Sequence, residues 1–141
     1  MQLSVACAED APRMQRREED AALVLGDSIT GVLLGQCSAW PRGPVSEGFY
    51  EPLRTDTPAL LLSGELDPVT PPRYGDDVVR HLPNGRHLVA PGQGHNVFGS
   101  GCAPQLMGRF IAAADAKSLD VTCLQQLAPP PPFVGPFGWD P

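Results

Sequence analysis

The sequence predicts a small α/β protein whose centre is one parallel β-α-β unit between Pro58 and Asn96. Two apolar runs of strand length, at 59–63 and 87–90, are separated by a segment with helical periodicity. Strands joined in this way pair in parallel through a right-handed crossover. A second amphipathic segment and a proline-rich tail follow. We therefore expect a small parallel β-α-β core with flanking helices and a Pro-rich C-terminal tail.

The two expected helices are recognised by apolar residues that recur every three or four positions. The crossover helix covers 72–82 and ends at Pro83-Asn84-Gly85; its apolar positions are Tyr74, Val78, Val79 and Leu82. The second helix covers 104–116, with Leu106, Met107, Phe110, Ile111 and Ala114 on one face. Both helices can cover the strands with an apolar face.

The remaining segments carry weaker signals. Residues 1–20 pass into a charged run and predict a solvated helix or loop, and 21–37 fit either a strand-turn-helix or one glycine-interrupted helix. Residues 40–52 are rich in glycine and proline, which indicates a loop or linker. The tail at 128–141 contains four consecutive prolines and should be extended. One domain over 1–127 and a Pro-rich tail at 128–141 are expected.

Composition excludes several classes of partner. A formal charge of −6 and a pI near 4.8 argue against binding to nucleic acid or to an anionic membrane surface. No apolar run approaches the roughly 18 residues that span a bilayer, and residues 1–10 do not resemble a signal peptide, so a cytoplasmic location is expected for the chain as written. Neither a metal-ligand set nor a phosphate-binding glycine loop is present, so no cofactor is expected.

Four widely spaced cysteines favour two disulfides over a zinc site. None of Cys7, Cys37, Cys102 and Cys123 forms a Cys-x-x-Cys pair. Buried free thiols are the alternative. Disulfides are typical of exported proteins, which conflicts with the lack of an export signal unless the chain descends from a longer, exported ancestor.

Two residues with catalytic potential follow the predicted strands. Asp67 comes after the first strand and His95 after the second. Because the carboxyl ends of parallel strands meet at one edge of a sheet, the two side chains should lie close together. A carboxylate that fixes a histidine ring makes it a general base, so the pair is two thirds of a hydrolytic triad. The simpler alternatives are a turn aspartate before Pro68 and a surface loop histidine.

Several blocks resemble a known family. Leu60-Leu61-Leu62-Ser63-Gly64-Glu65-Leu66-Asp67-Pro68-Val69-Thr70-Pro71, Gly94-His95-Asn96 and Gly101-Cys102 are similar to the C-terminal part of α/β-hydrolases related to bacterial tripeptidyl aminopeptidases and proline iminopeptidases. Cys7-Ala8-Glu9-Asp10 and Cys37-Ser38-Ala39-Trp40-Pro41 also resemble blocks of that family, so the likeness covers roughly 3–125.

The resemblance implies roles for particular residues. It makes Asp67 the triad acid and His95 the general base, and it pairs Cys7 with Cys37 and Cys102 with Cys123 as bridges of an exported enzyme. A full member also carries a Gly-x-Ser-x-Gly nucleophile elbow upstream, and this sequence has none. The chain therefore resembles a hydrolase truncated before the elbow, and the resemblance does not identify which residue is the nucleophile.

Ser28 is the best candidate nucleophile. Gly26-Asp27-Ser28 follows an apolar run and keeps the Gly-x-Ser of an elbow; it also resembles the Gly-Asp-Ser block of the SGNH esterases, whose other blocks are absent. A loop or N-cap serine is the alternative. Ser63, at the end of the first strand, and Ser38, beside a cysteine, are weaker candidates, and His81 and His87 are expected to be structural or solvated.

Two functions fit these observations. The first is a serine-hydrolase-type carboxylesterase for small or short-chain esters, with Ser28, His95 and Asp67 as nucleophile, base and orienter. The second is a non-catalytic remnant or accessory fragment of a split hydrolase. A small sheet with an open edge should pair with another copy, so a homodimer is expected in either case.

Overall fold

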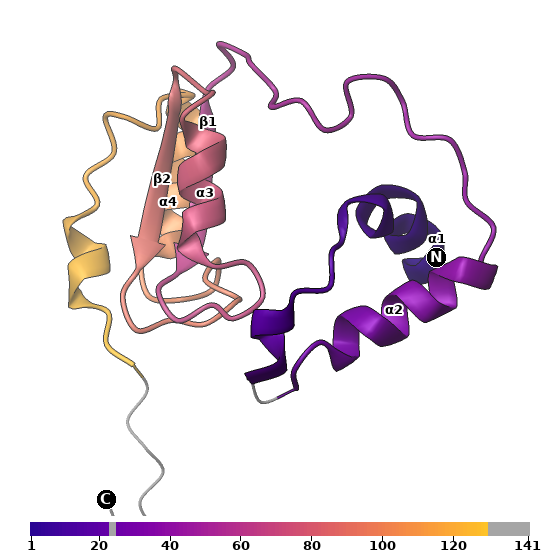
Figure 1. Cartoon of the computed structure of the whole chain (residues 1–141). Helices are drawn as coiled ribbons and strands as arrows, with labels where there is room; N and C mark the ends of the chain where they lie inside the picture. The colour runs from indigo at the N-terminus through magenta and orange to yellow at the C-terminus, as the bar shows by residue number, and fades with distance from the viewer. Residues whose placement is uncertain (23–24, 130–141) are drawn as a thin grey trace, which may run out of the picture. The chain divides into compact units, whose positions relative to one another are not determined.

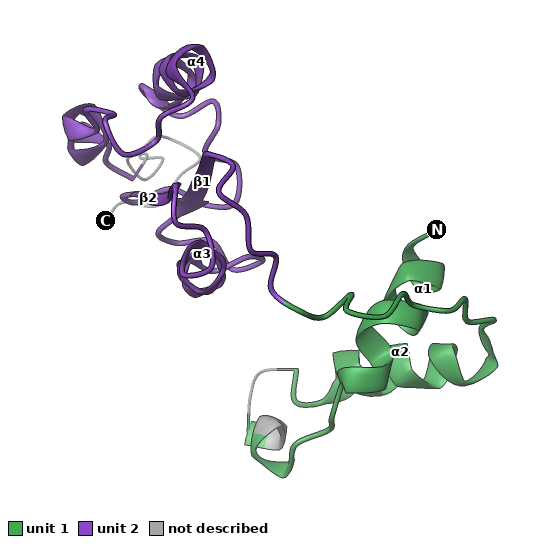
Figure 2. Cartoon of the chain, turned by 90° about the horizontal axis from the view of Figure 1, so that it is seen from above, with its two compact units in different colours: residues 1–51 green, residues 52–141 purple. Residues whose placement is uncertain are grey.

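The computed structural model describes residues 1–22 and 25–129, and these form two compact units. One unit spans Met1–Glu51 and the other Pro52–Pro141 (Figure 2). The boundary falls at the end of the Gly/Pro-rich segment that the sequence marks as a loop or linker. The prediction of one domain over 1–127 stays a prediction.

The second unit contains the expected β-α-β core (Figure 1). Strand β1 (Ala59–Gly64), helix α3 (Pro72–Val79) and strand β2 (Gly85–Ala90) follow one another, and the strands pair in parallel with Ala59 opposite Gly85 and Gly64 opposite Ala90. Pro72 stands in the first turn of α3, where its missing N–H costs nothing. The expected α/β core is therefore confirmed at this level, although α3 ends three residues earlier than predicted.

Helices cover both faces of this two-stranded sheet. Figure 2 shows α3 on one face and α4 (Ala103–Ala113) on the other. Leu88, Leu106 and Leu124 form the buried core on the α4 side, together with the partly buried Leu60 and Leu62. The Cys102–Cys123 disulfide joins the start of α4 to a short 3-10 helix at Thr122–Gln126. The α4 face is thus the packed side of the unit.

The first unit is helical and has a small core. It contains α1 (Gln2–Val5), short helical turns up to Arg13, and α2 (Ser28–Ala39). The buried residues are Cys7, Ala11 and Cys37, and a Cys7–Cys37 disulfide ties the early turns to α2. With so few apolar contacts, this bridge is a main constraint on the unit.

The disulfides, residues 21–37 and the tail can be compared with the predictions. Both disulfides pair as the resemblance implies. For residues 21–37, a turn at 25–27 precedes α2, so the turn-helix part of the first alternative is present and a single helix over the segment is not. Residues 23–24, in the part expected as a strand, lie outside the described residues. The tail from residue 130 also lies outside them. Ala128, the first residue of the predicted tail, is described, and its carbonyl accepts a hydrogen bond from the Gln93 side-chain amide at 3.0 Å.

Candidate functional site

A tight turn after β1 holds Asp67 in place. The Asp67 N–H donates to the Gly64 carbonyl at 3.2 Å. Its carboxylate oxygen Oδ1 accepts the N–H groups of Val69 at 2.8 Å and Thr70 at 3.0 Å. An aspartate that bonds backbone groups two and three residues ahead forms an Asx turn, which suits the Asp-Pro sequence. Asp67 is therefore a turn residue, as the alternative expected. The turn bonds use Oδ1 and leave Oδ2 available to other partners.

His95 reaches the same edge from the end of β2. The turns that follow the strands are joined by hydrogen bonds, since the Leu66 N–H donates to the Gln93 carbonyl at 2.9 Å and the Glu65 N–H to Ala90 at 3.0 Å. His95 then places Nδ1 3.0 Å from Oδ2 of Asp67. The sequence prediction that an aspartate and an imidazole meet at one edge matches this geometry.

Thr70 is a third member that the sequence did not single out. Its hydroxyl donates to Oδ2 of Asp67 at 2.8 Å and lies 3.3 Å from Nδ1 of His95. With its proton directed at Asp67, the hydroxyl oxygen can share the Nδ1–H of His95. In the sequence, Thr70 could have been recognised only by its place three residues after Asp67. That spacing is also common in turns without a catalytic role.

The carboxylate is buried but fully hydrogen-bonded. The Asp67 side chain is 2% exposed. Burial alone would raise the pKa of Asp67, but the hydrogen bonds from the Thr70 N–H, the His95 ring, the Thr70 hydroxyl and the Val69 N–H outweigh burial and hold the pKa well below its ordinary value. Asp67 is therefore ionised at neutral pH and faces His95 as a fixed negative charge.

This arrangement prepares His95 to act as a base. An ionised Asp67 only accepts hydrogen bonds, so the Nδ1 of His95 carries the proton and Nε2 keeps a lone pair. Among the described residues nothing is hydrogen-bonded to Nε2, and the side chain is 51% exposed. The ring can thus take a proton from a hydroxyl that approaches from solvent, and Asp67 stabilises the imidazolium that results.

Ser28 lies in the other unit. It is the first residue of α2, follows Asp27 at the N-cap, and lines a shallow groove of about 390 Å³ with apolar side chains of the same helix. Asp27 makes no cap bond and pairs with Arg16. Because the pair with His95 belongs to the second unit, the role of Ser28 as nucleophile stays a prediction.

The two weaker serine candidates make local contacts. The Ser38 hydroxyl donates to the Gly35 carbonyl one turn earlier in α2. The Ser63 hydroxyl oxygen lies 2.8 Å from Nε2 of His87, not beside the Asp67–His95 pair.

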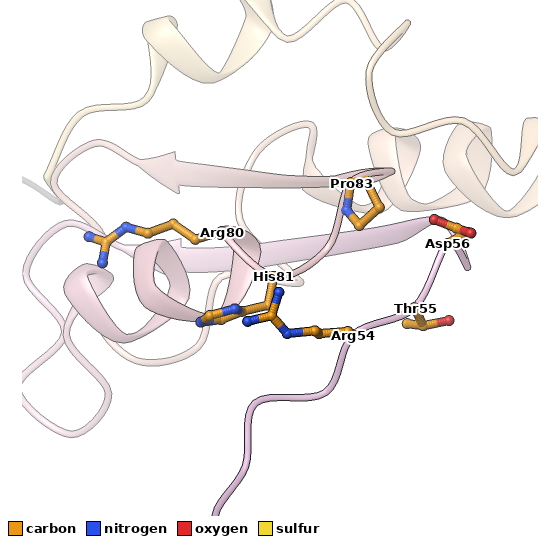
Figure 3. A pocket seen from close by; sticks show the side chains of 6 residues that line it. All are labelled: Arg54, Thr55, Asp56, Arg80, His81 and Pro83. Atoms are coloured by element: carbon orange, nitrogen blue, oxygen red, sulfur yellow. The ribbon is translucent and has the colours of Figure 1, made fainter.

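A second hollow lies away from this edge. A groove of about 400 Å³ is lined by residues that precede the two strands or follow α3. Figure 3 shows their side chains: Arg54, Thr55, Asp56, Arg80, His81 and Pro83. Asp56 and Pro83 mark the amino-terminal ends of the strands, whereas Asp67 and His95 follow the carboxyl ends. This groove is therefore not part of the candidate site.

The part of the chain that the structure describes has neither a metal-ligand cluster nor a membrane-spanning helix. No group of three or more histidine, cysteine or acidic side chains there could hold a metal ion. Within the same residues, none of the helices has the length and apolarity needed to cross a bilayer.

Comparison with known proteins identifies the family. A family model described as "TAP-like protein", within the α/β-hydrolases, matches residues 22–123, which include Asp67, His95 and three of the four cysteines. Neither a curated protein nor a solved structure matches the chain. The matched segment is more than two thirds of the sequence and contains the whole β-α-β unit, and so the chain belongs to the TAP-like family of α/β-hydrolases.

Proposed function

We propose that the protein is a serine-hydrolase-type carboxylesterase that acts on small or short-chain esters. Asp67 orients the ring, His95 is the general base, and Ser28 is the nucleophile. The observation that carries the proposal is the 3.0 Å contact between Nδ1 of His95 and a buried, ionised Asp67, which leaves Nε2 available to a substrate or nucleophile. Membership of a hydrolase family supports the same reaction class.

The proposed reaction has two steps. The Ser28 hydroxyl attacks the ester carbonyl while Nε2 of His95 takes its proton, and the alcohol leaves with that proton. Water then releases the acid from the acyl-serine by the same route. Esters are preferred to peptides in this proposal, because no Gly-x-Ser-x-Gly elbow supplies a complete oxyanion hole and the amide is the harder bond to break.

The experiment compares two serines on one helix. Turnover of p-nitrophenyl acetate and labelling by a fluorophosphonate probe are measured in a Ser63→Ala background, because Ser63 contacts a second histidine. The variants compared there are the otherwise unchanged chain, Ser28→Ala and, as control, Ser38→Ala. We expect the probe on the peptide that contains Ser28, and a large loss of both signals only in Ser28→Ala. If Ser28 stays unlabelled in the otherwise unchanged chain, and turnover survives both Ser28→Ala and His95→Ala unchanged, the assignment is rejected.

A second function is favoured by the surface beside β1. Within the described residues only β2 pairs with β1, and an apolar groove of about 290 Å³ lies along it, lined by Leu60, Leu62, Phe98, Met107, Phe110 and Ile111. An open strand edge next to an apolar groove is suited to pairing with another copy. The alternative proposal is therefore a non-catalytic accessory fragment that self-associates as a dimer through this edge.

Light scattering after size-exclusion chromatography tests the alternative. Ile111 and Leu66 are 76% and 61% exposed, but only Ile111 lines the groove. We expect a dimer in wild type and in Leu66→Asp, and a monomer in Ile111→Asp. A wild-type monomer at high micromolar concentration would exclude self-association through the groove.

A further inference from the structure

A second Ser–His–Asp chain of hydrogen bonds crosses the β-α-β unit. The Oγ of Ser63 on β1 lies 2.8 Å from Nε2 of His87 on β2, and Nδ1 of His87 lies 2.9 Å from Oδ1 of Asp76 on α3. The hydroxyl, the two ring nitrogens and the carboxylate thus occur in the order required to activate a serine. None of these three residues belongs to the Asp67–His95 pair.

Strand register and a glycine create this arrangement. His87 is paired with Leu61, and Ser63 is two residues further along β1, so both side chains stand on the same face of the sheet as diagonal neighbours. Helix α3 covers that face. A Cβ at Gly75 would lie 2.4 Å from Nε2 of His87, so only glycine at this position leaves room for the ring.

The three residues differ in burial: the His87 side chain is buried, Ser63 is partly buried and Asp76 is exposed. The His87 side chain is 4% exposed, whereas Asp76 is 58% exposed and Ser63 is partly buried. Both ring nitrogens are within hydrogen-bond distance of a partner, so the ring orientation is fixed. A ring held between a carboxylate and a hydroxyl is arranged as a base for that hydroxyl.

The N–H of Gly64, the residue after Ser63, is a candidate donor for a developing oxyanion. The N–H groups of Ala59 and Glu65 donate towards β2, to Asn84 and Ala90. Because N–H directions alternate along a strand, the Gly64 N–H points to the opposite edge of β1. In α/β-hydrolase elbows the N–H of the residue after the nucleophile serves the oxyanion.

We propose that Ser63 is a second nucleophile of this chain, activated by His87 and oriented through Asp76, and that it accepts acyl groups from small activated esters. The Ser63 oxygen forms a bond to the ester carbonyl carbon, and its proton passes to Nε2 of His87. The bond from that carbon to the leaving oxygen then breaks, and the leaving group departs with the proton. The product is an acyl-Ser63, with no oxidation or reduction.

The site goes beyond the proposed function and is independent of it. Neither Asp67 nor His95 takes part, so acylation of Ser63 should survive His95→Gln. Loss of Ser63 acylation would leave the Ser28 proposal untouched, and the reverse also holds. Peptide mapping separates the two serines.

The test is acylation by p-nitrophenyl acetate, mapped by mass spectrometry of peptides from the full chain. We expect acetyl-Ser63 in wild type and in His95→Gln, an initial rate about 100-fold lower in His87→Gln, and no modification there in Ser63→Ala. Asp76→Asn should also slow the reaction. Ser118 is the matched control because it is an exposed serine whose hydrogen-bond partner is Asp115 and not a histidine.

A thiol variant keeps the proposal testable if His87→Gln fails to fold. In Ser63→Cys the thiol faces His87, so iodoacetamide should alkylate it at least about tenfold faster than the thiol of Ser118→Cys, because the imidazole promotes the thiolate. An unmodified Ser63 in folded wild type, or alkylation of Ser63→Cys no faster than that of Ser118→Cys, overturns the proposal and leaves a hydrogen-bonded brace between α3 and the sheet.

Discussion

Replacing Asp67 by asparagine should prevent His95 from acting as a base, while the turn that holds residue 67 stays intact. Oδ1 of Asp67 accepts the two backbone N–H groups, and the side-chain oxygen of an asparagine can keep both bonds. The amide NH₂ then occupies the place of Oδ2, where Thr70 and His95 now bond. Since an NH₂ group can only donate, the Nδ1 of His95 must become the acceptor and the proton must move to Nε2.

The expected loss follows from that tautomer. A histidine protonated on Nε2 cannot take a proton from the nucleophile. In serine proteases the corresponding exchange lowers turnover by about 10⁴-fold while the geometry stays intact. We therefore expect a loss of about 10³- to 10⁴-fold in p-nitrophenyl acetate turnover attributable to His95, with a circular dichroism spectrum like that of wild type.

The assay combines turnover with the tautomer itself. Long-range ¹H–¹⁵N correlation spectra should place the His95 proton on Nδ1 in wild type and on Nε2 in Asp67→Asn. Asp56→Asn is the matched control, since Asp56 is exposed and lies at the opposite end of β1. A variant that keeps the Nδ1–H form, or that keeps wild-type turnover with the tautomer exchanged, would refute the reasoning.

Three further predictions concern stability. The double variant Cys7→Ser with Cys37→Ser should lose about 3–4 kcal/mol in the first unit, because the bridge closes a loop of 30 residues, so the helical signal of that unit should melt first while the second unit stays folded. Gly64→Ala should cost about 3 kcal/mol or more in chemical denaturation, because its Cβ would lie 2.0 Å from the Gly94 carbonyl oxygen; unchanged stability would contradict the close packing of the two turns. The pKa of Asp67 is lower in the folded chain than the unfolded value of about 3.9, so the unfolded state binds the Asp67 proton first as the pH falls. The ionised Asp67 therefore stabilises the fold fully above about pH 5, and this stabilisation should be lost progressively below pH 4. In Asp67→Asn the free energy of unfolding should depend less on pH in this range.

The β-α-β core could be predicted because its signals are local. Two short apolar runs, the helical spacing of the apolar residues between them and Pro83-Asn84-Gly85 at the end of the helix predicted the order of elements within a few residues. The meeting of Asp67 and His95 followed from strand direction alone, since both follow a strand and the strands are parallel. The disulfide pairing, in contrast, came only from the family resemblance.

Other features depend on details that local patterns do not carry. The contact between Ser63 and His87 requires a specific register, and a shift of one residue would place one of them on the other face. Thr70 gains its role from a turn whose hydrogen bonds become visible only in three dimensions. Ser28 was suggested as the nucleophile by the short motif Gly26-Asp27-Ser28. Because Ser28 and His95 belong to different units, that role stays a prediction.

The most direct test of the central claim is turnover of p-nitrophenyl acetate by His95→Gln, measured in a Ser63→Ala background so that the second serine contributes nothing. His81→Gln is the control, because His81 lines the groove near the start of the strands. If Asp67 holds His95 as the general base, His95→Gln should lower the turnover by at least about 100-fold relative to the Ser63→Ala protein. His81→Gln should leave the turnover of the Ser63→Ala protein unchanged. Equal turnover in the two variants would contradict the account.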